Sequence, residues 1–235
     1  MRSEADRVAL WSIALDGDPT AAAALADGLD AAELRRATEI VSSDARARFI
    51  TARAFVRAVL GQELGVAPVS LAFARGPYGK PYLPGTSIRF SLSHTRTVAL
   101  LAVTRGEEVG VDIEELPRGG RYERVSARCF AEAEAWRVRE CDPALRPRLF
   151  ATLWAAKEAY LKMTGEGLGR GLNTFVVDVG DDWRPVLSSV DGAPPRRPVA
   201  LHPLDLAVDG IAMLCASAAL RVGIVRHVAT IGARP

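Results

Sequence analysis

The predicted order of helices and strands recurs at an offset of roughly 100 residues, and this recurrence limits the folds open to the chain. A long helix with an apolar stripe, closed by glycine, is predicted at residues 49–60 and again at 149–163. Each is followed by a short strand and, after a polar turn, by an apolar hairpin, at 89–103 and 199–217. Two halves of similar α+β architecture, with a ligand between them, would give this order.

The fold class predicted from this order is α+β, with two similar tandem halves arranged as a pseudo-dimer and the active site in the cleft between them. In each half, a small antiparallel sheet packs against a long helix. The N-terminal half is assigned to residues 1–106, the C-terminal half to 107–225, and a tail to 226–235.

Local signals set the bounds of several elements. Gly61 is expected to end the first long helix, residues 69–73 to form a strand, and residues 126–140 to form one helix. The first long helix is expected to start earlier, at residue 42, and four arginines along 42–60 lie either on a solvated face or where they can hold phosphate. They are Arg46, Arg48, Arg53 and Arg57.

Composition argues against several functions. Apolar residues make up 49% of the 235 residues, yet no apolar run approaches the length of a membrane span. The formal net charge of +2 is small for a protein that binds nucleic acid. The three cysteines lack metal-ligand spacing, and the N-terminus shows no signal-like apolar core. A cytoplasmic protein that binds neither nucleic acid nor membrane is expected.

One helix carries an unusual set of charges. Residues 154–162 read Trp-Ala-Ala-Lys-Glu-Ala-Tyr-Leu-Lys, a helical composition without glycine or proline. At about 100° per residue, Lys157, Glu158 and Lys162 share one face of this helix with an aromatic and an aliphatic side chain. Taken alone, the pattern is typical of a Glu–Lys pair beside a core stripe.

A second acidic stretch changes this interpretation. Residues 110–114 read Gly-Val-Asp-Ile-Glu, and in a strand the side chains of Asp112 and Glu114 point to the same side. If this strand meets the helix that carries Glu158, three carboxylates converge beside two lysines. Proteins hold Mg²⁺ against a phosphorylated substrate with such sets of oxygen ligands and cations.

These two stretches, about forty residues apart, resemble the two-part signature of the 4′-phosphopantetheinyl transferases. Two further stretches in the first half are similar to family motifs: Tyr-Gly-Lys-Pro at 78–81 and Phe-Ser-Leu-Ser-His at 90–94. The length and the internal repeat resemble the long, surfactin-synthetase-activating (Sfp) type, whose members are monomers of two tandem halves.

The resemblance implies a reaction on coenzyme A. The enzyme would transfer 4′-phosphopantetheine to a serine of an acyl or peptidyl carrier protein and release 3′,5′-adenosine diphosphate. The metal would be Mg²⁺, with Mn²⁺ as an alternative. The carriers would belong to fatty-acid, polyketide or nonribosomal-peptide synthesis. Phosphoryl transfer needs positioning and charge neutralisation more than covalent help, which agrees with this set of acids and lysines.

The resemblance also implies roles for individual residues. The metal ligands would be Asp112, Glu114 and Glu158, and the base that takes the serine proton would be Glu158 or Glu134. Lys157 and Lys162 would neutralise charge on phosphate oxygens. The residues that would hold the phosphates of coenzyme A are Arg48, Lys80, Ser93 and His94, together with the two lysines. For Glu134, a place on a solvated acidic helix is the alternative.

Two other functions fit the same residues. Another Mg²⁺-dependent phosphoryl- or nucleotidyl-transfer enzyme would use the same acids and lysines, and a carrier-binding module without catalysis would keep the same fold. The loop after the acidic strand is rich in arginine and is expected either to steer an acidic carrier or to be solvated. Its arginines are Arg118, Arg121, Arg124 and Arg128.

Overall fold

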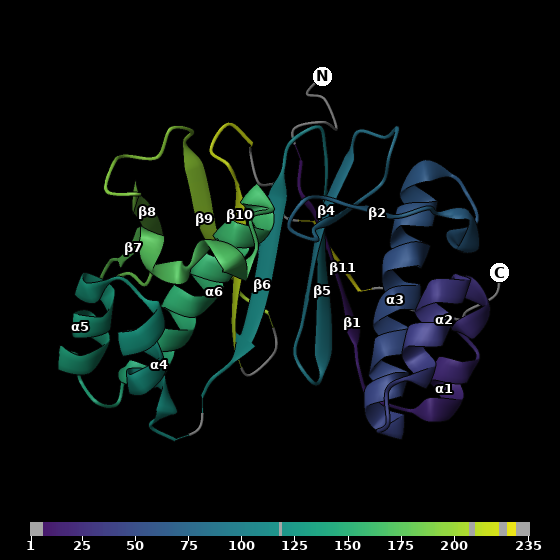
Figure 1. The fold of residues 1–235 in the computed structure, drawn as a ribbon, viewed down its shortest axis with the longest axis horizontal. Coiled ribbons are helices and arrows are strands. Elements are labelled where there is room, and N and C mark those ends of the chain that lie inside the picture. The colour runs from purple at the N-terminus through teal and green to yellow at the C-terminus, as the bar shows by residue number, and fades with distance from the viewer. Residues whose placement is uncertain (1–6, 118, 207–209, 221–224, 229–235) are drawn as a thin grey trace.

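Two small β-sheets lie side by side at the centre of the molecule, and helices cover the outer side of each (Figure 1). The computed structural model describes residues 7–117, 119–206, 210–220 and 225–228. The expected α+β class and its small antiparallel sheets are confirmed, whereas the pseudo-dimer relation and the half boundaries stay predictions. No helix in the described part of the chain is both long enough and apolar enough to cross a membrane.

The first sheet has the strand order β11-β1-β5-β4, in which β11 and β1 are parallel and the other neighbours antiparallel. Helix α3 (Ser43–Leu64) packs on its outer face, where Phe55 and Leu60 meet Leu101 of β5. The other elements are β1 (Ala9–Ala14), α1 (Pro19–Ala23), α2 (Ala31–Thr38), β2 (Ala74–Arg75), β3 (Pro81–Tyr82), β4 (Ile88–His94), β5 (Val98–Arg105) and β11 (Val225–Val228).

The second sheet has the antiparallel order β6-β10-β9, with α6 (Arg146–Thr164) on its outer face. Helix α6 approaches β6 so closely that a Cβ at Gly110 would lie 1.9 Å from the carbonyl oxygen of Ala159, so this contact requires glycine. The other elements are β6 (Val109–Glu115), α4 (Arg121–Cys129), α5 (Glu132–Glu140), β7 (Phe175–Val179), β8 (Pro185–Val190), β9 (Val199–Leu204) and β10 (Gly210–Ser217).

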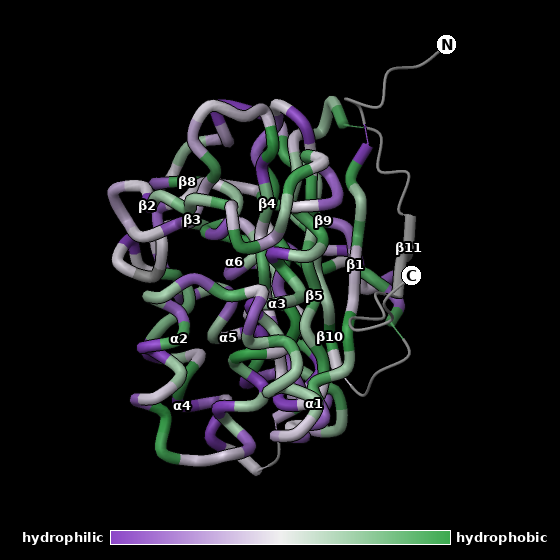
Figure 2. The backbone as a smooth tube through the Cα atoms, turned by 90° about the vertical axis from the view of Figure 1, so that its right-hand side faces the viewer, coloured by the Kyte–Doolittle hydropathy of each residue, from purple (hydrophilic) through white to green (hydrophobic). Residues whose placement is uncertain are grey.

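The inner faces of the two sheets share one apolar core. Leu100 and Ala102 of β5 pack there with Val111 of β6 and Leu214 of β10, while Leu101 of β5 points to α3. Figure 2 shows the hydrophobic colour along β5 and β10. The period-two alternation of a strand between two apolar layers explains why β5 reads as a continuous apolar run.

Side chains, and not a backbone ladder, join the two sheets where β4 faces β6. The hydroxyl of Ser91 accepts a hydrogen bond from the backbone N–H of Val111 (3.0 Å), and that of Ser93 from the N–H of Ile113 (3.3 Å). The two edge strands are thereby held next to each other, and we call this contact the serine seam.

Several expected bounds are wrong. Helix α3 continues through Gly61 to Leu64 and ends at Gly65, whose φ of 68° suits glycine. Residues 68–70 form a 3₁₀ turn, and the expected strand at 69–73 is replaced by the two-residue strands β2 and β3. The helix expected over 126–140 is broken at Phe130, which is extended. Residues 225–228, expected to end the second half and start the tail, pair with β1, and residues 229–235 lie outside the described part.

One arginine of α3 is neither solvated nor near a ligand site. Arg57 is fully buried and bonds the carboxylates of Asp30 and Glu33, which lie at the start of α2. It also donates to the carbonyl oxygens of Pro68 (2.9 Å) and Leu71 (3.0 Å). Arg57 therefore fixes α2 and the turn after α3 to the helix itself.

Candidate active site

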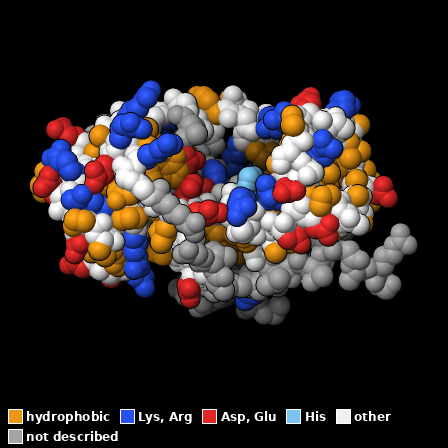
Figure 3. All heavy atoms as spheres, turned by 90° about the horizontal axis from the view of Figure 1, so that it is seen from below, with side chains coloured by type: hydrophobic (Ala, Val, Ile, Leu, Met, Phe, Trp, Pro, Cys, Tyr) orange, Lys and Arg blue, Asp and Glu red, His pale blue; other side chains and the backbone are white. Residues whose placement is uncertain are grey.

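A cleft runs along the serine seam between α3 and α6. It consists of two neighbouring cavities of about 630 and 390 Å³, which share Arg53 and Leu92. Seen from below, the molecule is hollowed at its centre, with acidic and basic side chains around the opening (Figure 3). The larger cavity is lined by residues of α3, β4, the β4–β5 turn and β6, among them Arg48, Phe49, His94, Arg96 and Glu114. The smaller is lined by residues of α3, the β2–β3 hairpin, β4 and α6, among them Arg75, Tyr78, Lys80, Glu158 and Lys162.

Asp112 lies buried beneath the cleft, on the face of β6 that meets α6. Its Oδ1 accepts hydrogen bonds from the Ser93 hydroxyl (2.8 Å) and from the Lys162 ammonium group (2.6 Å). Its Oδ2 is buried and has no hydrogen-bond partner among the described residues. A buried carboxylate oxygen without a partner is costly, so a ligand that paired with this atom would relieve that cost.

Glu114 and Glu158 complete the acidic wall of the cleft. Burial raises the pKa of Glu114 to about 7, with the negative charges of Asp112 and Glu158 acting in the same direction. Burial, and then the charge of Asp112, also raises the pKa of Glu158. The three carboxylates therefore repel one another, and a cation between them would relieve this repulsion.

This donor set fits a hard divalent cation, although its members are not assembled around one. In the described ranges, no three or more His, Cys, Asp or Glu side chains are grouped as a metal site. Lys162 bonds Asp112, and the side chain of Trp154 hydrogen-bonds Glu114. Carboxylate oxygens are nonetheless the ligands that Mg²⁺ prefers, and Asp112 Oδ2 lacks a partner. Asp112, Glu114 and Glu158 are the residues that would hold Mg²⁺.

Lys157 and Glu134 lie away from the cleft, in the core behind α6. Lys157 is fully buried and bonds Glu134 (2.7 Å) and the carbonyl oxygens of Leu172 (2.8 Å) and Phe175 (2.5 Å). Glu134 also accepts the backbone N–H groups of Val177 and Ala131. Burial lowers the pKa of Lys157 and raises that of Glu134, each opposed by the partner's charge. The structure does not bring this pair together with Glu158. The contact of Lys157 with phosphate and the role of Glu134 as base stay predictions, and this geometry does not support them.

The opposite wall carries two basic residues that have no partner within the described ranges. Arg48 and His94 line the larger cavity, and neither side chain has a hydrogen bond or ion pair with another described residue. Lys80 differs, because its ammonium group bonds Glu108 (2.5 Å) and the carbonyl oxygens of Val109 (3.2 Å) and Met163 (3.0 Å). Lys80 thus connects the β2–β3 hairpin to β6 and to the C-terminus of α6, and it also lines the smaller cavity.

Two residues of the site were not predicted. Arg53 lines both cavities and was one of four undifferentiated arginines on its helix. Helical periodicity gave no signal for Arg53, since residues 48 and 53 lie about 140° apart around a helix. Trp154 belongs to the predicted signature without an assigned role, and its side chain binds Glu114.

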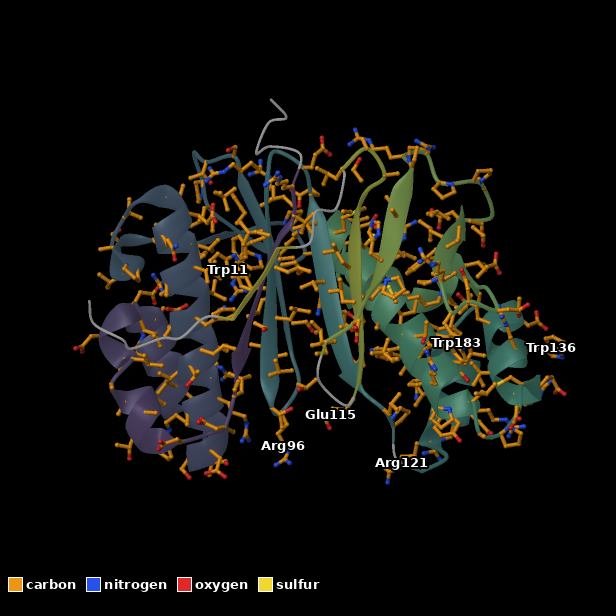
Figure 4. All side chains as sticks on the ribbon, turned by 180° about the vertical axis from the view of Figure 1, so that it is seen from behind. Trp11, Arg96, Glu115, Arg121, Trp136 and Trp183 are labelled. Carbon is orange, nitrogen blue, oxygen red and sulfur yellow. The ribbon has the colours of Figure 1, made fainter. Side chains whose placement is uncertain are left out.

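The predicted arginine-rich loop is largely helical. Arg121, Arg124 and Arg128 are exposed on α4, and Arg118 lies outside the described residues. In Figure 4, Arg121 projects at the same end of the molecule as Arg96 and Glu115, which line the larger cavity. The first exposed arginine of α4 therefore lies at the same end of the molecule as the larger cavity.

Carboxylates on one wall and unpaired basic side chains on the other are what a transferase acting on phosphorylated groups requires. The sequence profile of the 4′-phosphopantetheinyl transferase superfamily matches residues 108–209. The 4′-phosphopantetheinyl transferase HetI of Nostoc sp. is 34% identical over 169 residues, which are 70% of this chain and 71% of HetI. The chain therefore belongs to the 4′-phosphopantetheinyl transferase superfamily and is an enzyme of that class, as its motifs predicted.

Two further comparisons show lower sequence identity. The 4′-phosphopantetheinyl transferase Sfp of Bacillus subtilis is 26% identical over 141 residues, 60% of this chain and 62% of Sfp. A solved holo-(acyl-carrier-protein) synthase from Bacillus anthracis, in complex with CoA (3′,5′-ADP), is 23% identical. It covers 47% of this chain and 95% of its own with a TM-score of 0.36, too low to support a comparison of the sites.

Removing the charge of Glu114 should flatten the pH dependence of stability when divalent cations are absent. The pKa of Glu114 is raised from 4.5 to about 7, so between these values the folded protein keeps a proton that the unfolded chain has released. The free energy of unfolding should therefore fall as the pH rises through this range, and Glu114→Gln should lose most of that slope. Thermal unfolding of both proteins in chelator measures the difference. Parallel curves would show that Glu114 does not titrate there.

Proposed function

We propose that this enzyme transfers 4′-phosphopantetheine from coenzyme A to a serine of an apo carrier protein, with Mg²⁺, and releases 3′,5′-ADP. The observation that carries the proposal is a cleft lined by Glu114 and Glu158, with Asp112 buried beneath it and basic side chains without described partners on the other wall. Membership of the superfamily supports phosphopantetheine as the transferred group. The three carboxylates support Mg²⁺ as the metal, because it prefers oxygen ligands.

The residues on this wall would act by position and charge. The serine oxygen forms a bond to the phosphorus that carries pantetheine, and the bond from that phosphorus to the bridging oxygen of the leaving nucleotide breaks. Lys162, whose side chain is 29% exposed and whose ammonium group bonds Asp112, would neutralise charge on the phosphate oxygens. Glu158, which has no hydrogen bond to a described residue and a raised pKa, would take the serine proton. A bound Mg²⁺ would supply further charge neutralisation on the pyrophosphate.

The first half would hold the nucleotide end of coenzyme A, including its adenine and 3′-phosphate. The basic residues that line the two cavities from this side are Arg48, Arg53, Arg75, Lys80, His94 and Arg96. The two cavities together, about 630 and 390 Å³, are of the size that ligands of this class occupy. These lining residues support the assignment of residues 1–106 to this role.

Arg48→Ala should weaken the binding of coenzyme A by roughly tenfold to a hundredfold, and that of dephospho-coenzyme A much less. The reason is that a charge-assisted contact contributes about 1.5–3 kcal/mol and arginine can bind phosphate through two parallel hydrogen bonds. Calorimetric titration of the variant with both ligands measures this. Arg46→Ala is the matched control, because Arg46 lies on the same helix but donates to the carbonyl oxygen of Ile40 (2.8 Å).

Equal losses for the two ligands would show that Arg48 does not bind the 3′-phosphate. Lys80→Ala belongs to the same experiment. All three protons of the Lys80 ammonium group already have acceptors within the protein. An equal loss of affinity for both ligands would therefore show that Lys80 connects the hairpin to α6 and does not bind phosphate.

One assay tests the whole proposal. The protein is incubated with coenzyme A, Mg²⁺ and an apo carrier domain, and intact-mass spectrometry measures the carrier. We expect a mass gain of one phosphopantetheine, located on serine, with 3′,5′-ADP in the filtrate. An unmodified carrier with coenzyme A still intact would reject the proposal, and cleavage of coenzyme A without modification of the carrier would favour another phosphoryl-transfer reaction.

The partners proposed are acyl or peptidyl carrier domains of fatty-acid, polyketide or nonribosomal-peptide synthases. Arg121, Arg124 and Arg128 expose positive charge on α4, which suits an acidic carrier surface. The monomeric state and the cytoplasmic location stay predictions.

A further inference from the structure

Ser93 uses its entire hydrogen-bonding capacity within the protein. A hydroxyl group has one donor and two acceptor positions. The Ser93 hydroxyl donates to Asp112 Oδ1 (2.8 Å) and accepts from the Ile113 N–H (3.3 Å) and the Lys162 ammonium group (2.9 Å). Ser93 is also 7% exposed. A phosphate oxygen needs a donor, so Ser93 could hold phosphate only by releasing Asp112.

These bonds fix the orientation of the Asp112 carboxylate. Ser93 and Lys162 both bind Oδ1, from β4 and from α6, so the carboxylate is held from two elements at once. The same arrangement leaves Oδ2 buried and without a partner among the described residues. Of the two oxygens, Oδ2 is therefore the one that a further ligand would pair with.

We propose that Ser93 is a positioning residue, which holds Asp112 so that Oδ2 is the oxygen that binds the divalent cation. This inference rests on the proposed function and replaces the predicted contact between Ser93 and a phosphate of coenzyme A. A residue that holds one oxygen of a metal-binding carboxylate orients the other oxygen. It thereby influences the affinity for the metal without contacting the metal itself. Lys162 belongs to the same group of contacts but also faces the cleft, so Ser93 is the cleaner residue to test.

The experiment compares Ser93→Ala with Ser91→Ala. Both substitutions remove one hydrogen bond of the serine seam, to the N–H of Ile113 or of Val111, but only Ser93 touches a carboxylate. Mn²⁺ affinity of the ligand-free protein is measured by calorimetric titration. We expect Ser93→Ala to weaken Mn²⁺ binding by roughly tenfold to a hundredfold. Ser91→Ala should change it by less than about threefold, since its loss is confined to the seam.

Kinetics separates positioning from a phosphate contact. Ser93→Ala should lower kcat at fixed Mg²⁺ and change KM for coenzyme A by less than about threefold, and Ser93→Thr, which keeps the hydroxyl, should restore most of the loss. A raised KM for coenzyme A with unchanged Mn²⁺ affinity would overturn the inference in favour of a phosphate contact. Equal effects of Ser91→Ala and Ser93→Ala on Mn²⁺ affinity would show that Ser93 only joins the two strands of the serine seam. That result would also overturn the inference.

The titration also separates this inference from the proposed function. Mn²⁺ binding needs no carrier and no turnover, so an inactive wild-type protein with the expected difference between variants would reject the reaction and keep the role of Ser93. A wild-type protein that binds no Mn²⁺ would reject the role of Ser93, whatever the carrier assay shows.

Discussion

Asp112→Asn should lower turnover by about a hundredfold or more while the protein stays folded, because a single group that stabilises developing charge contributes on this scale. The amide keeps the shape of the carboxylate and can still accept from Ser93 and Lys162 through its oxygen, so the fold is spared. What is lost is the negative charge beside the buried, unpartnered Oδ2. Initial rates of carrier modification at several Mg²⁺ concentrations, with circular dichroism as a check of folding, measure the effect.

Two companion variants sharpen this result. Asp112→Ala and Glu158→Gln are expected to lose activity to a similar degree, since each removes a proposed oxygen ligand of the cation. Asp178→Asn is the matched control, because Asp178 is an exposed carboxylate on β7. Near wild-type turnover of Asp112→Asn and Glu158→Gln at modest Mg²⁺ would show that these carboxylates do not hold the metal.

Lys157→Ala should destabilise the protein by roughly 3–5 kcal/mol, the range found when one partner of a buried ion pair is removed. Lys157 is fully buried, its ammonium group lies 4.3 Å from the ring centre of Phe175, and its loss leaves the Glu134 carboxylate buried without its cation. Urea unfolding followed by circular dichroism measures the change. Lys162→Ala is the control on the same helix: with 29% of its side chain exposed, Lys162 should affect turnover more than stability.

The double variant Lys157→Met with Glu134→Gln tests the reason for the loss. Replacing both charges at once removes the unpaired partner, so it should be clearly more stable than Lys157→Ala. Glu134→Gln alone should lower stability, because the Glu134 carboxylate accepts hydrogen bonds from Lys157 and from two backbone N–H groups. It should leave the pH profile of kcat unchanged, because these contacts lie away from the cleft. A Lys157→Ala protein as stable as wild type but inactive would restore the predicted phosphate contact.

The sequence by itself determined the chemistry of the acidic wall. Alternation along residues 110–114 places Asp112 and Glu114 on the side of β6 opposite Val111, and the structure confirms that side as the one that meets α6. The helix that carries Glu158 is also found where predicted and ends at Gly165, as expected, whereas the first long helix ends at Gly65 and not at the predicted Gly61. These features depend on local periodicity and turn chemistry, which neighbours in the chain decide.

Only the tertiary structure decided which charged residue faces which environment. Lys157 and Glu158 are adjacent in a helix, about 100° apart, and the packing of α6 on β6 turns the first into the core and the second into the cleft. Nothing in the sequence distinguishes Arg57 from Arg48 on the same helix. Arg57 is buried because it pairs with two carboxylates that come from a separate helix. The bonds of Ser93 come from β6 and α6, so no local pattern contains them. Periodicity gives the direction of a side chain about its own helix or strand, whereas its partners depend on contacts between distant segments, and these exist only in the folded chain.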